Sequence, residues 1–377
     1  MINEERLTNE MLELVRIDSE TGYEQEIAGH LKQRFESLGC IVEEDGAAGV
    51  TGHGAGNLIC TWPAEKIHAE ADMIYFTSHM DTVTPGQNVQ PVLEDGVMKS
   101  DGTTVLGADD KAGLAVMLET IRSIQEENKP HGPVQFVITV GEESGLKGAK
   151  ALDTSLLRAK MGYALDSDGS VGHIVTSAPY QSKLEIKVNG RKAHAGLAPE
   201  KGISAITAAA RAVSRMPLGR IDEETTANIG SFEGGGPTNV VCDEVSIVAE
   251  ARSLSEEKLN TQVEQMKSAV QNAAQSMGTT SEVQDTLMYS GYKLDEEDRV
   301  VALAFKAAET IGLEPKMLQS GGGSDANIIS GYGIPTVNLA VGYEHIHTTD
   351  EKIPVSELQK LAELVTTIIE QAASEDR

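Results

Sequence analysis

Cysteine is scarce in this sequence. The 377 residues contain three cysteines, Cys40, Cys60 and Cys242, which lie far apart and form no C-x-x-C pair. This spacing predicts reduced, structural thiols rather than a disulfide framework, as is typical of a cytoplasmic protein.

Long apolar runs are also absent. No stretch approaches the roughly 18 apolar residues that a membrane-spanning helix needs. The N-terminal stretch "MINEERLTNEMLELVRIDSE" is charged and amphipathic, without the apolar centre of a signal peptide. We therefore expect a soluble chain with no membrane partner.

Basic residues are outnumbered by acidic ones. The 31 Lys and Arg residues face 58 Asp and Glu residues, which gives a formal net charge of -27 at pH 7. Such an excess of negative charge argues against nucleic acid or an anionic membrane surface as the main partner.

Apolar residues are abundant enough for well-packed cores, at 40% of the chain. A chain of 377 residues exceeds what one core usually supports, so two domains are expected. Alternating apolar runs and amphipathic helical patterns predict an α/β fold with a mixed, mostly parallel central sheet flanked by helices. The expected strands include residues 57–62, 72–82, 134–143 and 161–168, and the expected helices include 23–39 and 110–128.

The pattern changes near Tyr180. From there the order of expected elements is β-α-β-β-α-β, which is the ferredoxin-like arrangement. We therefore predict an α/β domain formed by residues 1–179 and 291–377, interrupted by an inserted α+β domain at residues 180–290.

Several stretches place acidic or histidine side chains at the ends of expected strands, where the ligand sites of open α/β sheets gather. Each stretch alone has an ordinary structural explanation, such as a hydrogen-bonded His-x-Asp pair, a solvated Glu-Glu turn or a helix N-terminus that favours acidic residues. The stretches are "TSHMDT" with His79 and Asp81, "LGADDKAG" with Asp109 and Asp110, "TVGEESG" with Glu142 and Glu143, "ALDSDG" with Asp166, and "YEHIHTTDE" with His345 and His347.

Taken together, these stretches indicate a metal site. Several carboxylates that converge without cations would repel one another strongly. A pair of divalent cations about 3.5–4 Å apart removes that repulsion, and needs one bridging carboxylate with terminal histidine or carboxylate ligands. A helix dipole or Lys111 could also compensate the adjacent Asp109 and Asp110.

Seven motifs, in order along nearly the whole chain, resemble those of the zinc peptidase family that contains peptidase T, aminoacylase and carboxypeptidase G. Within that family, "DGTTVLGADDKAG" is most similar to the peptidase T branch. The motifs are "SHMDTV", "TTVLGADDKAG", "GEESG", "ALDSDG", "KAHAGLAPEKGISAI", "GGPTNVV" and "HTTDE".

The resemblance implies two zinc ions per subunit, with Co or Mn as possible substitutes. His79, Asp109 and Asp166 would bind one ion. Asp109 would bridge to a second ion held by Glu143 and His347. His345 is a competitor for this last role, and the position of His347 four residues before Glu351 favours His347.

The resemblance also implies the roles of neighbouring residues. Asp81 would accept the second N–H of the His79 imidazole and fix its tautomer. Glu142 would act as general base and then as acid. Asp110 and Lys111 would support the ligands, and the Asp109–Asp110 peptide bond would be cis.

The inserted domain carries three further candidates. His194 would stabilise the oxyanion in the active site of a partner subunit, and Asn239 and Arg252 would bind the substrate carboxylate. A turn cap, a turn residue and a surface ion pair are the respective alternatives. The glycine-rich loop at 319–325 would lie against the substrate or act as a hinge.

The function that the resemblance implies is a peptidase T-like aminopeptidase, a homodimer that joins through the inserted domain and cleaves tripeptides or other short peptides. A dipeptidase or an N-acyl-amino-acid amidohydrolase would use the same chemistry. A glutamyl-aminopeptidase-type enzyme is disfavoured by "HAGLAPEKGISAI", and a peptide-binding module without activity would require a lost ligand.

Overall fold

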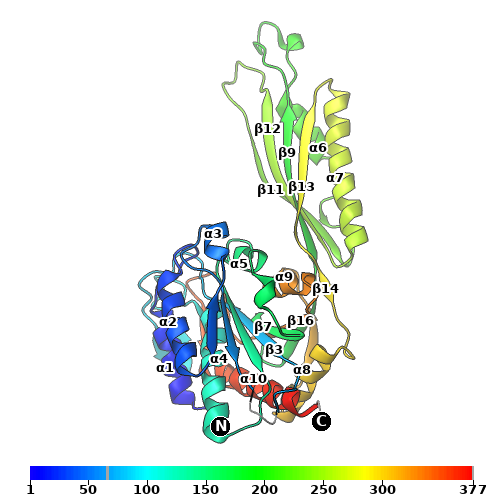
Figure 1. The fold of residues 1–377 in the computed structure, drawn as a ribbon. Helices are drawn as coiled ribbons and strands as arrows, with labels where there is room; N and C mark the ends of the chain where they lie inside the picture. The colour runs from blue at the N-terminus through cyan, green and yellow to red at the C-terminus, as the bar shows by residue number, and fades with distance from the viewer. Residues whose placement is uncertain (65–67, 376–377) are drawn as a thin grey trace. The chain divides into compact units, whose positions relative to one another are not determined.

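A computed structural model describes residues 1–64 and 68–375 of the chain (Figure 1). The chain forms two compact units, each described here by itself. The first unit contains Met1–Ser177, Leu294–Ser320 and Ser324–Arg377, and the second contains Ala178–Lys293 and Gly321–Gly323. A lid or dimerisation role for residues 180–290 remains a prediction.

The first unit is built on a mixed sheet whose strands follow the order β1-β2-β6-β3-β7-β16-β8, with β15 beside β8. The central pairs β6–β3, β3–β7 and β7–β16 are parallel. The predicted fold class is therefore confirmed. The strands are β1 (Ile41–Glu44), β2 (Leu58–Trp62), β3 (Ile74–His79), β6 (Val134–Thr139), β7 (Met161–Ser167), β8 (His173–Ala178), β15 (Lys316–Gln319) and β16 (Thr336–Ala340).

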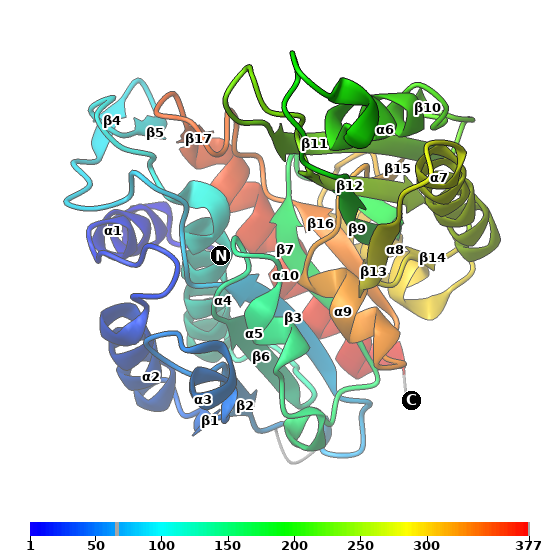
Figure 2. The same cartoon turned by 90° about the horizontal axis from the view of Figure 1, so that it is seen from above.

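Helices cover this sheet. Helix α4 (Ala108–Glu127) is apolar around most of its circumference because it packs between α1 (Glu4–Val15), α10 (Val355–Glu375) and strands β3 and β7. Helix α2 (Gln25–Ser37) packs on β1 and β2, as the view from above shows (Figure 2). The remaining elements are α3 (Ala47–Thr51), α5 (Lys147–Lys150), η2 (Thr154–Leu156), α8 (Arg299–Thr310), α9 (Asp325–Gly331), and a small sheet of β4 (Val92–Glu94), β5 (Val97–Lys99) and β17 (Lys352–Pro354).

The second unit has the predicted β-α-β-β-α-β order, with two short additional strands. Its antiparallel sheet follows the order β10-β11-β12-β9-β13. Side chains alternate between buried and more exposed along β12, and the buried ones join a core with the alanines of α6. The elements are β9 (Tyr180–Asn189), η3 (Pro199–Lys201), α6 (Ala205–Val213), β10 (Gly219–Arg220), β11 (Thr225–Gly234), β12 (Glu244–Ser253), α7 (Glu256–Ser276), β13 (Ser281–Tyr289) and β14 (Tyr292–Lys293).

Two further predictions concern the whole chain. All three cysteines are free thiols, as predicted. Among the residues that the structure describes, no helix combines the length and the apolar character needed to cross a lipid bilayer.

Candidate metal centre

The acidic and histidine residues singled out in the sequence gather at one edge of the sheet in the first unit. His79 ends β3, Glu142 and Glu143 follow β6, and Asp166 lies near the end of β7. These three strands are parallel neighbours, so their carboxyl ends meet at the same edge. The turn that opens α4 brings Asp109 to this edge.

Asp109 lies between two histidines. One carboxylate oxygen, Oδ1, is 3.0 Å from His79 Nε2, and the other, Oδ2, is 3.2 Å from His347 Nε2. A carboxylate that faces two imidazoles through its two oxygens has the placement of a bridging ligand.

A further carboxylate lies beside each of these histidines. His79 Nε2 is 3.8 Å from Asp166 Oδ1, and His347 Nε2 is 2.9 Å from Glu143 Oε1. The potential ligand atoms of His79, Asp109 and Asp166 lie within 4.8 Å of one another, and those of Asp109, Glu143 and His347 do so as well. Asp109 is common to both groups, so the side chains form two adjoining sets of nitrogen and oxygen donors, the donor types that zinc accepts.

The backbone at Asp109 departs from a regular helix. The Asp109–Asp110 peptide bond is cis, which confirms the prediction. Both residues have non-helical φ and ψ, although they lie in the first turn of α4. The carboxylate of the buried Glu351 accepts the backbone N–H of Asp109 at 3.0 Å and that of Gly107 at 2.8 Å.

Asp81 has a different contact from the one predicted. The nearest acceptor for His79 Nδ1 is the backbone carbonyl of Asp81 at 2.9 Å, whereas the Asp81 carboxylate is 3.6 Å away. The carboxylate instead accepts the backbone N–H of Glu142 at 2.9 Å, that of Glu143 at 3.3 Å, and the Thr21 hydroxyl at 2.6 Å. Asp81 therefore anchors the turn that carries both glutamates.

Protonation of this cluster reflects its excess of carboxylates. Burial, together with repulsion from Asp166, raises the pKa of Glu142 well above its ordinary value. Burial and the neighbouring Asp109 do the same for the pKa of Asp166. Hydrogen bonds to Asp109 and Glu143 raise the pKa of His347 to about 10. Protons are thus held tightly where cations would otherwise balance the charge, and a metal ion that binds the same atoms must release them.

Lys111 does not pair with Asp109. The buried Lys111 ammonium donates to the backbone carbonyl of Ile17 at 2.7 Å, and burial lowers its pKa to about 8. Asp110 turns into the protein, where its carboxylate accepts the N–H of Gly113 at 3.3 Å and where burial raises its pKa well above its ordinary value.

His345 lies outside both groups of potential ligands. It lines a cavity of about 580 Å³ in the first unit together with Asp168, Tyr343 and Glu344. His345 and His347 both have positive φ, at 60° and 62°, in the loop after β16.

Four residues near the ligands were missed in the sequence. Asn338 on β16 accepts the backbone N–H of Asp166 at 2.9 Å, and the Tyr343 hydroxyl donates to the Asp166 carboxylate at 3.3 Å. The buried Asp325 accepts from Thr139 at the end of β6, and burial raises its pKa to about 6. Glu351 served in the sequence only as a marker for His347. These contacts join segments that are far apart in the sequence, so local motifs do not predict them.

The candidates of the second unit fall into two places. The His194 side chain is exposed, and its Nδ1 accepts the backbone N–H of Gly196 and Leu197, each at 3.2 Å, which is the turn cap given as the alternative. A role for His194 at the oxyanion stays a prediction. Asn239 is close to His194, because the backbone carbonyl of Asn239 accepts the N–H of Ala195 at 2.9 Å.

Arg252 lies at the other end of β12. Its guanidinium pairs with Glu250 at 3.0 Å and donates to the carbonyl of Gly321 at 3.1 Å. Since β12 runs from Glu244 to Ser253 at about 3.3 Å per residue, Arg252 lies roughly 26 Å along the strand from Glu244, the end that follows the turn of Asn239.

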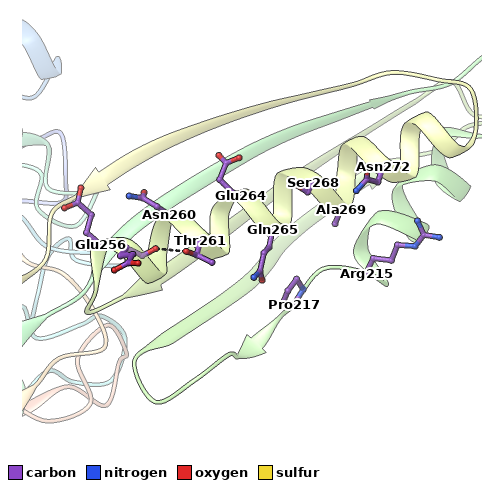
Figure 3. Close-up of a pocket in the computed structure, with 11 residues that line it drawn as sticks. Arg215, Pro217, Glu256, Asn260, Thr261, Glu264, Gln265, Ser268, Ala269 and Asn272 are labelled. Carbon is purple, nitrogen blue, oxygen red and sulfur yellow. Dashed lines mark hydrogen bonds between the residues drawn. The ribbon is translucent and has the colours of Figure 1, made fainter.

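A groove of about 1000 Å³ runs along α7 of the second unit (Figure 3). None of the predicted site residues lines it. The lining residues are Arg215, Pro217, Glu256, Glu257, Asn260, Thr261, Glu264, Gln265, Ser268, Ala269 and Asn272.

Another acidic cluster, in the first unit, already has its counter-charge. Glu10, Glu13 and His30 approach one another closely enough to hold an ion. The Arg34 guanidinium, however, lies 3.6 Å from Glu10 and 2.5 Å from Glu13, so this cluster is an ordinary ion-pair network.

Known proteins resemble this chain over most of its length. Residues 75–371 match the model of peptidase family M20/M25/M40. The aminopeptidase PepT from Bacillus cereus is 62% identical, with a TM-score of 0.94 and 99% of both chains covered. A tripeptidase from Staphylococcus aureus is 50% identical, with a TM-score of 0.96 and 100% of both chains covered. Peptidase T from Geobacillus kaustophilus is 29% identical over 389 residues, which cover 90% of this chain and 92% of that protein. The chain belongs to peptidase family M20/M25/M40.

Proposed function

We propose that this protein is a di-zinc aminopeptidase that removes the N-terminal residue of tripeptides and other short peptides. The observation that carries the proposal is the Asp109 carboxylate between His79 and His347, with a further carboxylate beside each histidine. The similarity to an aminopeptidase and a tripeptidase, at 62% and 50% identity, supports the substrate class.

The side chains present fit two zinc ions. His79, Asp109 and Asp166 would hold one ion, and Asp109, Glu143 and His347 the other. Such ions polarise a scissile carbonyl and lower the pKa of bound water to about 7. The same donors also accept Co or Mn, so the choice of zinc rests on the mixed imidazole and carboxylate set.

Glu142 is the general base in this proposal. Its carboxylate comes within 4.8 Å of the potential ligand atoms of His79 and Glu143, and its backbone is fixed by Asp81. A carboxylate with a raised pKa is suited to take a proton from the attacking water and to return it to the leaving amine.

Asn239 and Arg252 support a homodimer. If both bind the carboxylate of one short peptide, the roughly 26 Å of β12 that follow the turn of Asn239 before Arg252 is reached mean that one chain cannot supply both. We therefore assign them, in any one site, to different chains, joined through the second unit. The exposed His194 next to Asn239 would then enter the partner's site and stabilise the oxyanion.

We place the enzyme in the cytoplasm. Cys40 and Cys60 are buried, and burial raises the pKa of Cys40 to about 12, so its thiol stays protonated and unreactive. Reduced, inert thiols are typical of a reducing compartment.

Paired substitutions test the central assignment. Glu142→Ala should keep two metal ions per chain and abolish hydrolysis of Ala-Ala-Ala, whereas Glu143→Ala should lose metal. Metal analysis that shows the reverse would exchange the two roles. Faster hydrolysis of Ala-Ala or N-acetyl-Met than of Ala-Ala-Ala would identify a dipeptidase or an N-acyl-amino-acid amidohydrolase instead.

Subunit exchange tests the homodimer. A His194→Ala chain and a Glu142→Ala chain should each be inactive, and mixed dimers should regain one intact site if His194 acts in the partner. Confirmed exchange without recovered activity would refute this arrangement.

A further inference from the structure

Glu351 joins two segments that are far apart in the sequence. Its carboxylate accepts the backbone N–H of Gly107 at 2.8 Å and of Asp109 at 3.0 Å, across more than 240 residues. Glu351 is 1% exposed, so these contacts are shielded from water.

The N–H groups that Glu351 binds belong to the start of α4. The first N–H groups of a helix have no partner within the helix, and a side-chain oxygen of the N-cap residue commonly accepts one of them. Here Gly107 is the N-cap residue, with φ of 77°, and the distant carboxylate takes this place. The Asp109 carboxylate is thereby left to the two histidines that it contacts.

Glu351 also lies at the base of the loop that carries His347. Glu344 and Lys352 close this loop through two backbone hydrogen bonds, of 2.8 and 3.1 Å. Glu351 precedes Lys352 directly, and its own N–H donates to the carbonyl of Thr348 at 3.2 Å. One side chain therefore ties the base of this loop to the backbone of Asp109.

We propose that Glu351 is a positioning residue, which holds the Asp109 carboxylate and His347 in register for the second metal ion. This inference rests on the proposed di-metal function. Asp109 and His347 are 3.2 Å apart through Oδ2 and Nε2 and belong to the same potential ligand set, so a shift of either backbone changes that set. The set of His79, Asp109 and Asp166 retains two ligands outside the linked segments, so it should be affected less.

The test is Glu351→Gln in the full chain. The amide keeps the size of the side chain but has one acceptor oxygen, so one of the two backbone N–H groups faces an NH₂ group. We expect the affinity of the second site for zinc to fall by about 10–100-fold, as for other groups that orient metal ligands. We expect kcat for Ala-Ala-Ala to fall by a similar factor with little change in KM. The absorption spectrum of the Co²⁺-loaded protein should change, because it reports ligand geometry.

Glu119→Gln is the matched control. Glu119 lies on α4, ten residues after Asp109, and is also fully buried. Its carboxylate accepts the backbone N–H of Asn3 at 2.9 Å and pairs with Arg6. Its substitution should lower thermal stability while leaving both zinc affinities, kcat and the Co²⁺ spectrum unchanged.

The outcomes separate this inference from the proposed function. Wild-type protein that binds no zinc would overturn the di-metal proposal itself. Wild-type protein with two ions, and a Glu351→Gln variant with equal affinities, kcat and spectrum, would overturn only the role of Glu351. If Glu351→Gln does not fold, Glu351→Asp keeps the charge and both acceptor oxygens on a side chain one methylene shorter. A wild-type spectrum and kcat in that variant would equally refute the positioning role.

Discussion

Replacing Asp81 by Asn tests how the turn of the two glutamates is held. The Asp81 carboxylate is fully buried and accepts two backbone N–H groups, from Glu142 at 2.9 Å and from Glu143 at 3.3 Å. It also accepts the Thr21 hydroxyl at 2.6 Å. Asn has nearly the same shape but only one acceptor oxygen, so the substitution removes hydrogen-bonding capacity without opening a cavity.

The magnitude follows from these contacts. If the amide oxygen takes the place of Oδ1, it keeps the bond to Glu142 and its NH₂ group faces the N–H of Glu143. In the other orientation the amide oxygen keeps the bond to the Glu143 N–H, and the NH₂ group faces the N–H of Glu142. Either way one N–H of the turn loses its acceptor, which costs about 1–3 kcal/mol. At about 2–4 °C per kcal/mol, we expect the midpoint of thermal unfolding to fall by roughly 2–12 °C.

Activity should fall further than stability alone explains. A displaced turn moves the proposed base and a proposed ligand together, so we expect kcat and metal affinity to decrease by about 10–100-fold. Calorimetry, zinc content and hydrolysis of Ala-Ala-Ala measure the three quantities. Asp81→Ala, which removes both acceptors, should be more severe in all of them. An Asp81→Asn variant with wild-type kcat and zinc content would show that Asp81 does not position the turn.

Two further predictions concern the protons of the metal-free site and the support of Asp166. Metal-free protein should lose thermal stability as the pH rises from about 5 to about 9. Burial raises the pKa of Glu351 to about 7, and hydrogen bonds raise the pKa of His347 to about 10. Because both groups bind protons more tightly in the folded than in the unfolded chain, their contribution to stability is lost as the pH rises toward these values. Saturating zinc should replace the proton of His347 and add about 4 kcal/mol at 1,000 times its Kd. Calorimetry that shows no pH dependence without metal would contradict the raised pKa values of Glu351 and His347. Asn338→Leu leaves the Asp166 N–H without its acceptor at 2.9 Å, and should weaken one of two zinc affinities by about 10–100-fold in a chelator competition, where two unchanged affinities would exclude a role for Asn338.

The elements of the fold were readable from the sequence because their signals are local. The apolar run of β3 and the periodicity of α4 each identify an element without knowledge of its neighbours. The ferredoxin-like order of the second unit followed from the same kind of pattern. Strand ends were therefore known, and the general rule for α/β sheets placed the candidate ligands at one edge.

The supporting contacts were not readable, because they depend on segments that meet only in the folded chain. Glu351 binds the backbone of Asp109, and Asn338 binds that of Asp166, from 242 and 172 residues away. Glu351 ends the motif "HTTDE", but that motif does not predict which backbone groups its carboxylate binds, and Asn338 stands in an ordinary strand pattern. For Asp81 the residue was correctly singled out, but its partner was not, since a carboxylate two residues from a histidine can face the imidazole or the next strand.

Asp109 and Asp110 show most clearly where local information ends. They are identical neighbours in one turn, and their carboxylates have opposite protonation behaviour. Hydrogen bonds from His347 and His79 lower the pKa of Asp109 despite its burial, whereas burial raises that of Asp110, whose carboxylate accepts the N–H of Gly113. No property of the dipeptide distinguishes the two, so the distinction comes from what each carboxylate meets. Compensation of this pair of charges is therefore divided: histidines, and in our proposal metal ions, balance Asp109, while burial favours the neutral form of Asp110.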